Sequence, residues 1–187
     1  MWRWTVAVGV ILALVAPAWG ASLEGVKFDD EVMVGEKTLK LNGLGLRKKA
    51  WFKIYVAGLY LENPSSSVQA IIGSDEVKRV VMHFTSNLAK KKKMDAAWDE
   101  GFEDNTPGSE SKLAGELRTF KGYFKDMKEG DRVVLTVVPG TGTEVVLNDQ
   151  VKGTIEGDDF GTALLRVWLG PEPPGEDLKM GLLGKAD

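Results

Sequence analysis

Two glycines and an arginine stand close together early in the chain, in the stretch LNGLGLRKKAWFKIYVAGLYLE that runs from Leu41 to Glu62. Gly43 and Gly45 are spaced as in a phosphate-binding loop, and Arg47 follows them. Such a loop lies between a strand and a helix whose N-terminal N–H groups receive the phosphate. Here the residues after Gly45 are mainly aromatic, aliphatic or β-branched and predict a continued strand. No Gly-Lys-Ser/Thr sequence follows, so we interpret the stretch as strands and exclude a nucleotide site.

The composition excludes several other kinds of chemistry. The 187 residues contain no cysteine, so disulfides, thiol catalysis and thiolate-bound metals are absent. His83 is the only histidine and lies in an apolar run, where it has no partners for a catalytic triad or a zinc site. We interpret it as structural and expect no metal and no cofactor. The formal net charge of −3 gives no broad attraction for nucleic acid.

The first twenty residues predict an export signal. Arg3 precedes an apolar centre of about eleven residues between Thr5 and Val15, which is too short for the roughly twenty residues that span a bilayer. Small residues at Ala18 and Gly20 predict cleavage before Ala21. The alternative is an uncleaved membrane anchor.

We therefore divide the chain into a signal peptide at 1–20 and a single folded domain at 21–187. The domain is expected in the periplasm or outside the cell. Export without disulfides favours a bacterial periplasm.

The elements that must position Arg47 are strands. The run LKLNGLGL alternates apolar and polar or small residues with a slip near Gly43, which predicts a bulge. AWFKIYVAGLYLE is apolar on both faces, as in a strand that is covered on both sides. VKRVVMHFTS predicts another strand, and DRVVLTVVPG, TEVVLN and VKGTIEG predict consecutive hairpins.

Helices are predicted between and after these strands. SVQAIIGS predicts a short helix, and apolar residues at helical spacing predict two more over 94–102 and 113–127. DDFGTALLRVWLG predicts a last long helix, followed by the amphipathic tail GEDLKMGLLG. The basic run 90–93 is typical of a solvated turn, with contact to anionic lipid as the alternative. Because the strands come in groups, we predict an α+β domain with one antiparallel sheet and helices on one face.

The chain resembles the chalcone isomerase-like family at both ends of this domain. In that family a Gly-x-Gly-x-Arg segment precedes a strand that ends Gly-x-Tyr-Leu-Glu, and the matching residues here are Phe52, Lys53, Gly58, Tyr60, Leu61 and Glu62. The ending DDFGTALLRVWLGPEPPGEDLKMGLLG resembles that of the bacterial branch. The resemblance implies an open-faced β-sandwich: a large antiparallel sheet, a layer of α-helices on one face, and an apolar ligand cleft between them.

The resemblance also implies three ligand-binding candidates. The family's arginine before the central strand points an anion-binding guanidinium into the cleft and corresponds to Arg47, whose planar fork suits a carboxylate or phenolate. We expect Gly43 and Gly45 to bend one strand into the next and so bring this arginine to the cleft mouth. Tyr55 stands where the enzyme has a threonine. Lys53, two residues before Tyr55, is expected to point to the same side of the strand as Tyr55. Each candidate has an alternative. Arg47 could form a surface ion pair, Tyr55 could be a core tyrosine, and Lys53 could extend out of the cleft.

Two departures from the family pattern bear on the function. The plant enzymes close a chalcone into a flavanone with the help of a tyrosine after the next strand, whereas SNLAKKKKMDAAW contains none. No asparagine stands at 99–101, where the enzyme has one. We therefore predict no catalytic residues and a non-catalytic binder of a small amphipathic, fatty-acid-like anion, as in the related plastid proteins. The alternatives are an intramolecular lyase that acts on an enone and a partner-binding module; ligand identity and oligomeric state stay open.

Overall fold

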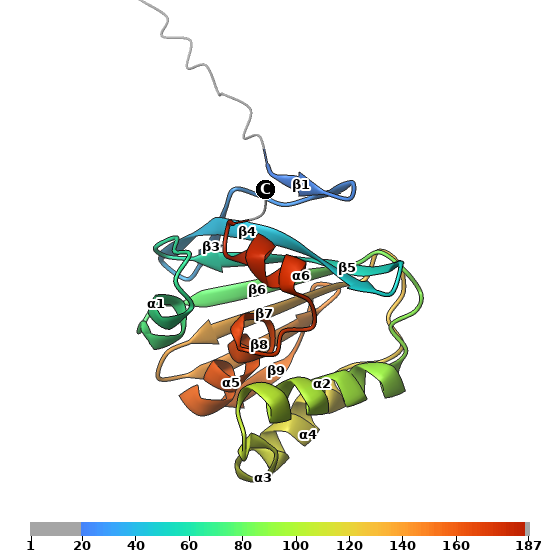
Figure 1. The fold of residues 1–187 in the computed structure, drawn as a ribbon. Coiled ribbons are helices and arrows are strands. Elements are labelled where there is room, and N and C mark those ends of the chain that lie inside the picture. The colour runs from blue at the N-terminus through green and yellow to red at the C-terminus, as the bar shows by residue number, and fades with distance from the viewer. Residues whose placement is uncertain (1–19, 186–187) are drawn as a thin grey trace, which may run out of the picture.

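A seven-stranded antiparallel sheet forms the centre of the computed structural model, which describes residues 20–185 (Figure 1). Its strands are neighbours in chain order: β3 (Glu31–Val34), β4 (Lys37–Lys49), β5 (Phe52–Leu61), β6 (Lys78–Phe84), β7 (Arg132–Val138), β8 (Gly142–Leu147) and β9 (Gln150–Glu156). Two short strands, β1 (Ser22–Leu23) and β2 (Val26–Lys27), form a separate hairpin. The expected signal peptide falls outside the described residues, except for Gly20.

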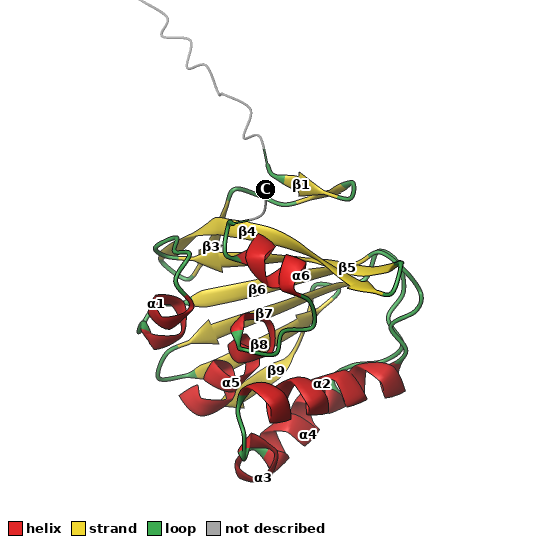
Figure 2. Ribbon diagram, viewed as in Figure 1, coloured by secondary structure: helices red, strands yellow, loops and turns green. Residues whose placement is uncertain are grey.

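Six helices complete the described part of the chain, and those that contact the sheet cover one face of it (Figures 1 and 2). They are α1 (Val68–Gly73), α2 (Lys91–Asn105), α3 (Ser109–Lys112), α4 (Ala114–Gly122), α5 (Asp158–Leu169) and α6 (Glu176–Leu182). The α+β class and the sheet with helices on one face are confirmed. Within residues 20–185, no helix is long and apolar enough to cross a membrane.

Two details of the helix predictions were wrong. The helix expected over 113–127 is shorter: α4 ends at Gly122, although the last expected apolar residues, Phe124 and Met127, are still buried, and the separate short helix α3 precedes it. The basic run 90–93 is not a turn, because α2 begins at Lys91. Three lysines therefore stand in the first turn of that helix.

Strand β5 has a core on each side, as its two apolar faces predicted. Tyr55, Ala57 and Leu59 are buried against the helices. Val56 and Tyr60 are buried on the opposite face, together with apolar residues of the neighbouring strands and of the N-terminal segment. The helix-side core is the larger of the two and holds the aromatic side chains that reach the candidate site.

The predicted bulge near Gly43 is confirmed, but the role expected for the glycines is not. The β4–β5 register shifts between Leu41 and Gly43, and β4 then continues as a single strand to Lys49. Side chains at 43 and 45 would collide with the carbonyl oxygens of Gly181 and Leu178 in α6. The glycines therefore allow α6 to lie directly on the strand, because only a backbone without Cβ leaves that space.

Candidate ligand-binding cleft

A cavity of about 360 Å³ lies between the sheet and α2. This volume is at the small end of the range that holds small-molecule ligands, ~300–1,000 Å³. Strands β5 and β6 form its floor, α2 one wall, and the loop between α5 and α6 its rim. The apolar lining comes from Ile54, Tyr55, Met82, Phe84, Leu88, Ala89, Met94, Ala97, Trp98, Val167, Pro173 and Pro174.

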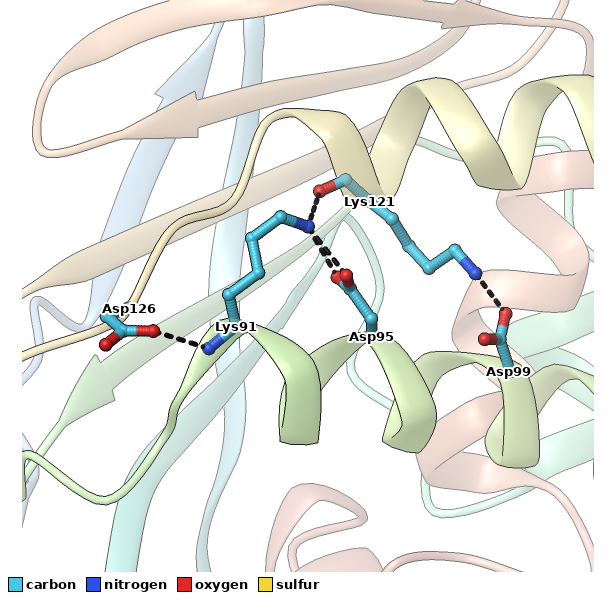
Figure 3. A network of polar contacts seen from close by, with 5 residues as sticks. All are labelled: Lys91, Asp95, Asp99, Lys121 and Asp126. Carbon is cyan, nitrogen blue, oxygen red and sulfur yellow. Dashed lines mark hydrogen bonds and ion pairs between the residues drawn. The ribbon is translucent and has the colours of Figure 1, made fainter.

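Polar contacts hold the α2 wall against α4 (Figure 3). Lys91 Nζ donates to both carboxylate oxygens of Asp95, at 2.8 and 2.7 Å, and to the Lys121 carbonyl oxygen at 2.9 Å. Lys121 Nζ in turn pairs with Asp99. The Lys91 N–H donates to Asp126 at 2.9 Å. Lys91, Asp95 and Asp99 follow one stripe of the helix, which leaves the stripe of Met94 and Ala97 to line the cavity.

Arg47 lies at the mouth of the cavity, opposite Tyr55 in the β4–β5 register. Its Nη1 donates to the carbonyl oxygens of Lys48, at 2.7 Å, and of Pro174. The arginine thereby ties the loop between α5 and α6 to the sheet. Among the described residues, its Nε and Nη2 groups donate to no protein acceptor and Arg47 forms no ion pair. This edge of the guanidinium can hold both oxygens of a carboxylate.

Tyr55 lines the same cavity and is buried. Its Oη accepts a hydrogen bond from Trp168 Nε1 at 3.0 Å. Burial raises the pKa of the Tyr55 phenol, while the hydrogen bond from Trp168 and the charge of Arg47 act in the opposite direction. The phenol is therefore protonated at neutral pH, and its hydrogen has no acceptor among residues 20–185. Tyr55 is thus a core residue that also lines the cavity.

Trp98 is a cleft residue that the sequence did not reveal. Its ring packs against Trp168 at 5.6 Å and 82°, as expected of a core residue. It also lines the cavity, and its buried Nε1 has no acceptor in the described part of the chain. An indole N–H can only donate. Helical spacing marks Trp98 as apolar and buried, but only the tertiary structure shows that its donor is unsatisfied.

Lys53 lies outside the cleft, although we expected it to share the side of Tyr55. The register pairs Arg47 with Tyr55 but Lys48 with Lys53, so a bulge at Ile54 adds one residue to β5. Both Ile54 and Tyr55 then face the cavity. The Lys53 side chain is about half exposed and pairs with Glu24 in the β1–β2 turn. Lys53 therefore does not belong to the candidate site.

Two further polar residues, Asn105 and His83, contact other parts of the fold and do not line the cavity. Asn105 is buried one turn beyond the place where the family's asparagine was expected; its Nδ2 donates to the carbonyls of Gly101 and Glu172, and its Oδ1 accepts from Glu172 N–H. These bonds hold the loop between α5 and α6 beside the cavity.

His83 lies on the opposite face of the sheet, with its ring edge-on to Phe28 at 5.0 Å. Residues 20–185 contain no cluster of side chains that could hold a metal ion.

Charged residues also line the cavity. They are Lys49 and Lys93, besides Arg47, and the carboxylates of Glu100, Asp104 and Glu172. Among the described residues none of these carboxylates forms an ion pair with Arg47. The free edge of its guanidinium would complement an anionic group.

Comparison with known proteins agrees with this architecture. A family model described as chalcone isomerase-like matches residues 20–184, so the chain belongs to that family. The crystal structure of an Arabidopsis thaliana fatty-acid binding protein superposes with a TM-score of 0.68 at 16% sequence identity, over 85% of this chain and 92% of that chain. This similarity confirms the chalcone isomerase-like fold. No curated protein matches the sequence.

Proposed function

We propose that the protein binds a small amphipathic anion, of the fatty-acid type, without converting it. One observation carries the proposal: Arg47, whose Nε and Nη2 donate to no protein acceptor among the described residues, lies at the mouth of a cavity whose lining is mostly apolar. A guanidinium edge without a protein partner, beside apolar side chains, suits the carboxylate of an amphipathic ligand. The similarity to a fatty-acid binding protein supports this class of ligand.

The binding mode follows from the two kinds of lining. A carboxylate is expected at Arg47 and the Tyr55 hydroxyl, where each charge-assisted hydrogen bond contributes about 1.5–3 kcal/mol. The hydrocarbon chain is expected between α2 and the sheet, against Met94, Ala97 and Phe84. Each buried CH₂ contributes about 0.8 kcal/mol, which is roughly a fourfold gain in affinity.

Calorimetric titration of delipidated protein with saturated fatty acids of increasing length tests the proposal. Affinity should rise about fourfold per CH₂ and level off once the cavity is full. Ala97→Phe places a ring in the cavity and should strongly weaken binding, whereas Ala96→Phe, at the preceding residue of the same helix but outside the lining, should not. Binding that survives Ala97→Phe unchanged, or an affinity independent of chain length, would contradict the proposal.

The alternative activity, cyclisation of a chalcone, makes a different prediction. Removal of one donor that stabilises developing charge typically lowers the rate of an enzyme ~10²–10³-fold. Because the family's second tyrosine has no counterpart, we expect no turnover above the spontaneous rate at neutral pH. Saturable, enzyme-dependent loss of chalcone absorbance would favour the isomerase.

We also propose that the protein is exported by a signal peptide at 1–20 and acts in the periplasm or outside the cell. The short apolar centre, the small residues before Ala21 and the absence of cysteine support this location. N-terminal sequencing of the exported protein should begin at Ala21. A protein that keeps Met1 in the membrane fraction would contradict it.

A further inference from the structure

The turn between β4 and β5 carries large apolar side chains into solvent. Trp51 is 83% exposed and Phe52 is 48% exposed, with ring centroids 5.7 Å apart. Burial of these side chains elsewhere in the molecule would be favourable by ~1.5–3 kcal/mol each, so their exposure needs an explanation. Aromatic side chains of this kind are typical of the interface between a membrane and water.

This turn lies beside the mouth of the cavity. Figure 1 shows the β4–β5 end next to the segment that leaves β6 and leads to α2. Lys49 from the turn, the 40%-exposed Leu88 from that segment, and Lys93 from α2 all line the cavity. We call this surface the tip: residues 48–52, Leu88 and residues 90–93.

The tip is strongly basic. Its exposed lysines are Lys48, Lys49, Lys90, Lys92 and Lys93, and of these only Lys90 forms an ion pair within the described residues, with Asp126 at 3.4 Å. The first turn of α2 contains no acidic residue. Lysines at a helix N-terminus oppose the helix dipole, so stability of α2 does not explain them. A basic, aromatic surface has the charge and chemistry that an anionic bilayer complements.

We propose that the tip docks on an anionic lipid bilayer, with Trp51 and Phe52 in the interfacial layer and the lysines against the headgroups. The cavity mouth then opens at the bilayer, where an amphipathic molecule can pass between lipid and protein. Docking uses side chains outside the cavity floor, so it can hold or fail independently of the ligand proposed above.

Co-sedimentation with vesicles tests docking. Wild-type protein should bind vesicles of phosphatidylcholine with about one-third phosphatidylglycerol, more weakly at high salt, and should bind pure phosphatidylcholine much less. Replacing two lysines, Lys48→Gln with Lys49→Gln, should lower binding about thirtyfold. The matched pair Lys27→Gln with Lys112→Gln, also exposed but outside the tip, should change it little.

A second comparison isolates the aromatic residues. Trp51→Ser should lower vesicle binding at least tenfold, while Met33→Ser, which is 59% exposed on β3, should not. Brominated lipid should quench the fluorescence of the wild type more than that of Trp51→Phe. Absence of binding to every vesicle, as expected if the tip instead contacts a protein, would overturn the proposal. Equal binding by Trp51→Ser or by the Lys48 and Lys49 double variant would overturn it as well.

Discussion

At the residue scale, the proposed function gives the guanidinium of Arg47 two roles. Nη1 holds the carbonyls of Lys48 and Pro174, which fixes both the side chain and the loop at the cavity rim. The opposite edge, Nε and Nη2, donates to no protein acceptor among the described residues and is assigned to the proposed ligand. A fixed guanidinium loses little side-chain freedom on binding, which favours affinity. The family resemblance pointed to Arg47, but its tie to Pro174 could not be predicted because the two residues are far apart in the sequence.

Substitution of Arg47 should therefore weaken ligand binding. For a medium-chain fatty acid, Arg47→Ala should cost about 1.5–3 kcal/mol, or roughly ten- to 150-fold in affinity. Arg47→Lys should recover only part, because a point charge cannot make the two-pronged contact. Calorimetry measures both, with circular dichroism as the folding control and Arg118→Ala, an exposed arginine on α4, as the matched control. Equal affinities for wild type and Arg47→Ala would show that this residue does not hold the anion.

His83 should make stability depend on pH. Burial, and then the charge of Arg132, lower its pKa in the folded state from the usual 6.5. The unfolded chain therefore takes up a proton at a higher pH than the folded protein, so stability is full above about pH 6.5 and falls as the pH drops below it. Urea unfolding between pH 7.5 and 5 should show this loss in the wild type and a flatter profile for His83→Gln. Identical profiles would mean that another group dominates.

At the element scale, the residues that carry the family resemblance are mostly scaffold. Gly58 leaves room for the ring of Phe28. Tyr60 Oη donates to the Asp29 carbonyl at 2.9 Å. Glu62 accepts from Lys37 Nζ at 2.8 Å and from the Val77 N–H at 2.7 Å. These contacts join β5 to its surroundings, which explains why the motif predicted the fold well and the site less well.

The errors at this scale have local causes. The bulge at Ile54 lies within a run of strand-forming residues, where no glycine marks it, so the side of Lys53 could not be read from alternation. Conversely, the bulge near Gly43 was predicted because glycine marks it. What the sequence did not show is that this glycine and Gly45 lie under α6, a contact between distant segments.

The contact of α6 with β4 predicts that replacing a glycine by alanine has opposite effects on stability at two positions. Gly45→Ala places a Cβ against the Leu178 carbonyl, so it should displace α6 and destabilise the protein by about 1–3 kcal/mol or more. Gly115→Ala in α4, where nothing lies within 4 Å of the new Cβ, should be stabilising by about 0.4–1 kcal/mol. Urea midpoints measure both. Equal midpoints for the two variants would contradict the close packing of α6.

At the scale of the whole molecule, the sheet, α2 and the loop after α5 form a mostly apolar cavity with Arg47 at its mouth. The class of fold could be predicted because the strands, the apolar residues at helical spacing and the family motif can each be recognised within a short stretch of sequence. The cavity lining could not, because Arg47, Tyr55 and Trp98 come from three elements that only the folded chain brings together. The exposed aromatic residues of the tip lie outside the lining of the cavity, so the ligand proposal does not account for them.

Native mass spectrometry of protein purified without detergent from the cells that produce it tests the central claim most directly. The account predicts that the wild type and Ala96→Phe carry an added mass of one small amphipathic acid, identified after organic extraction. Ala97→Phe should carry none. Wild-type protein that is consistently free of such a molecule and that also takes up none from a fatty-acid mixture, or an equal added mass in Ala97→Phe, would contradict the claim that this cavity holds an amphipathic anion.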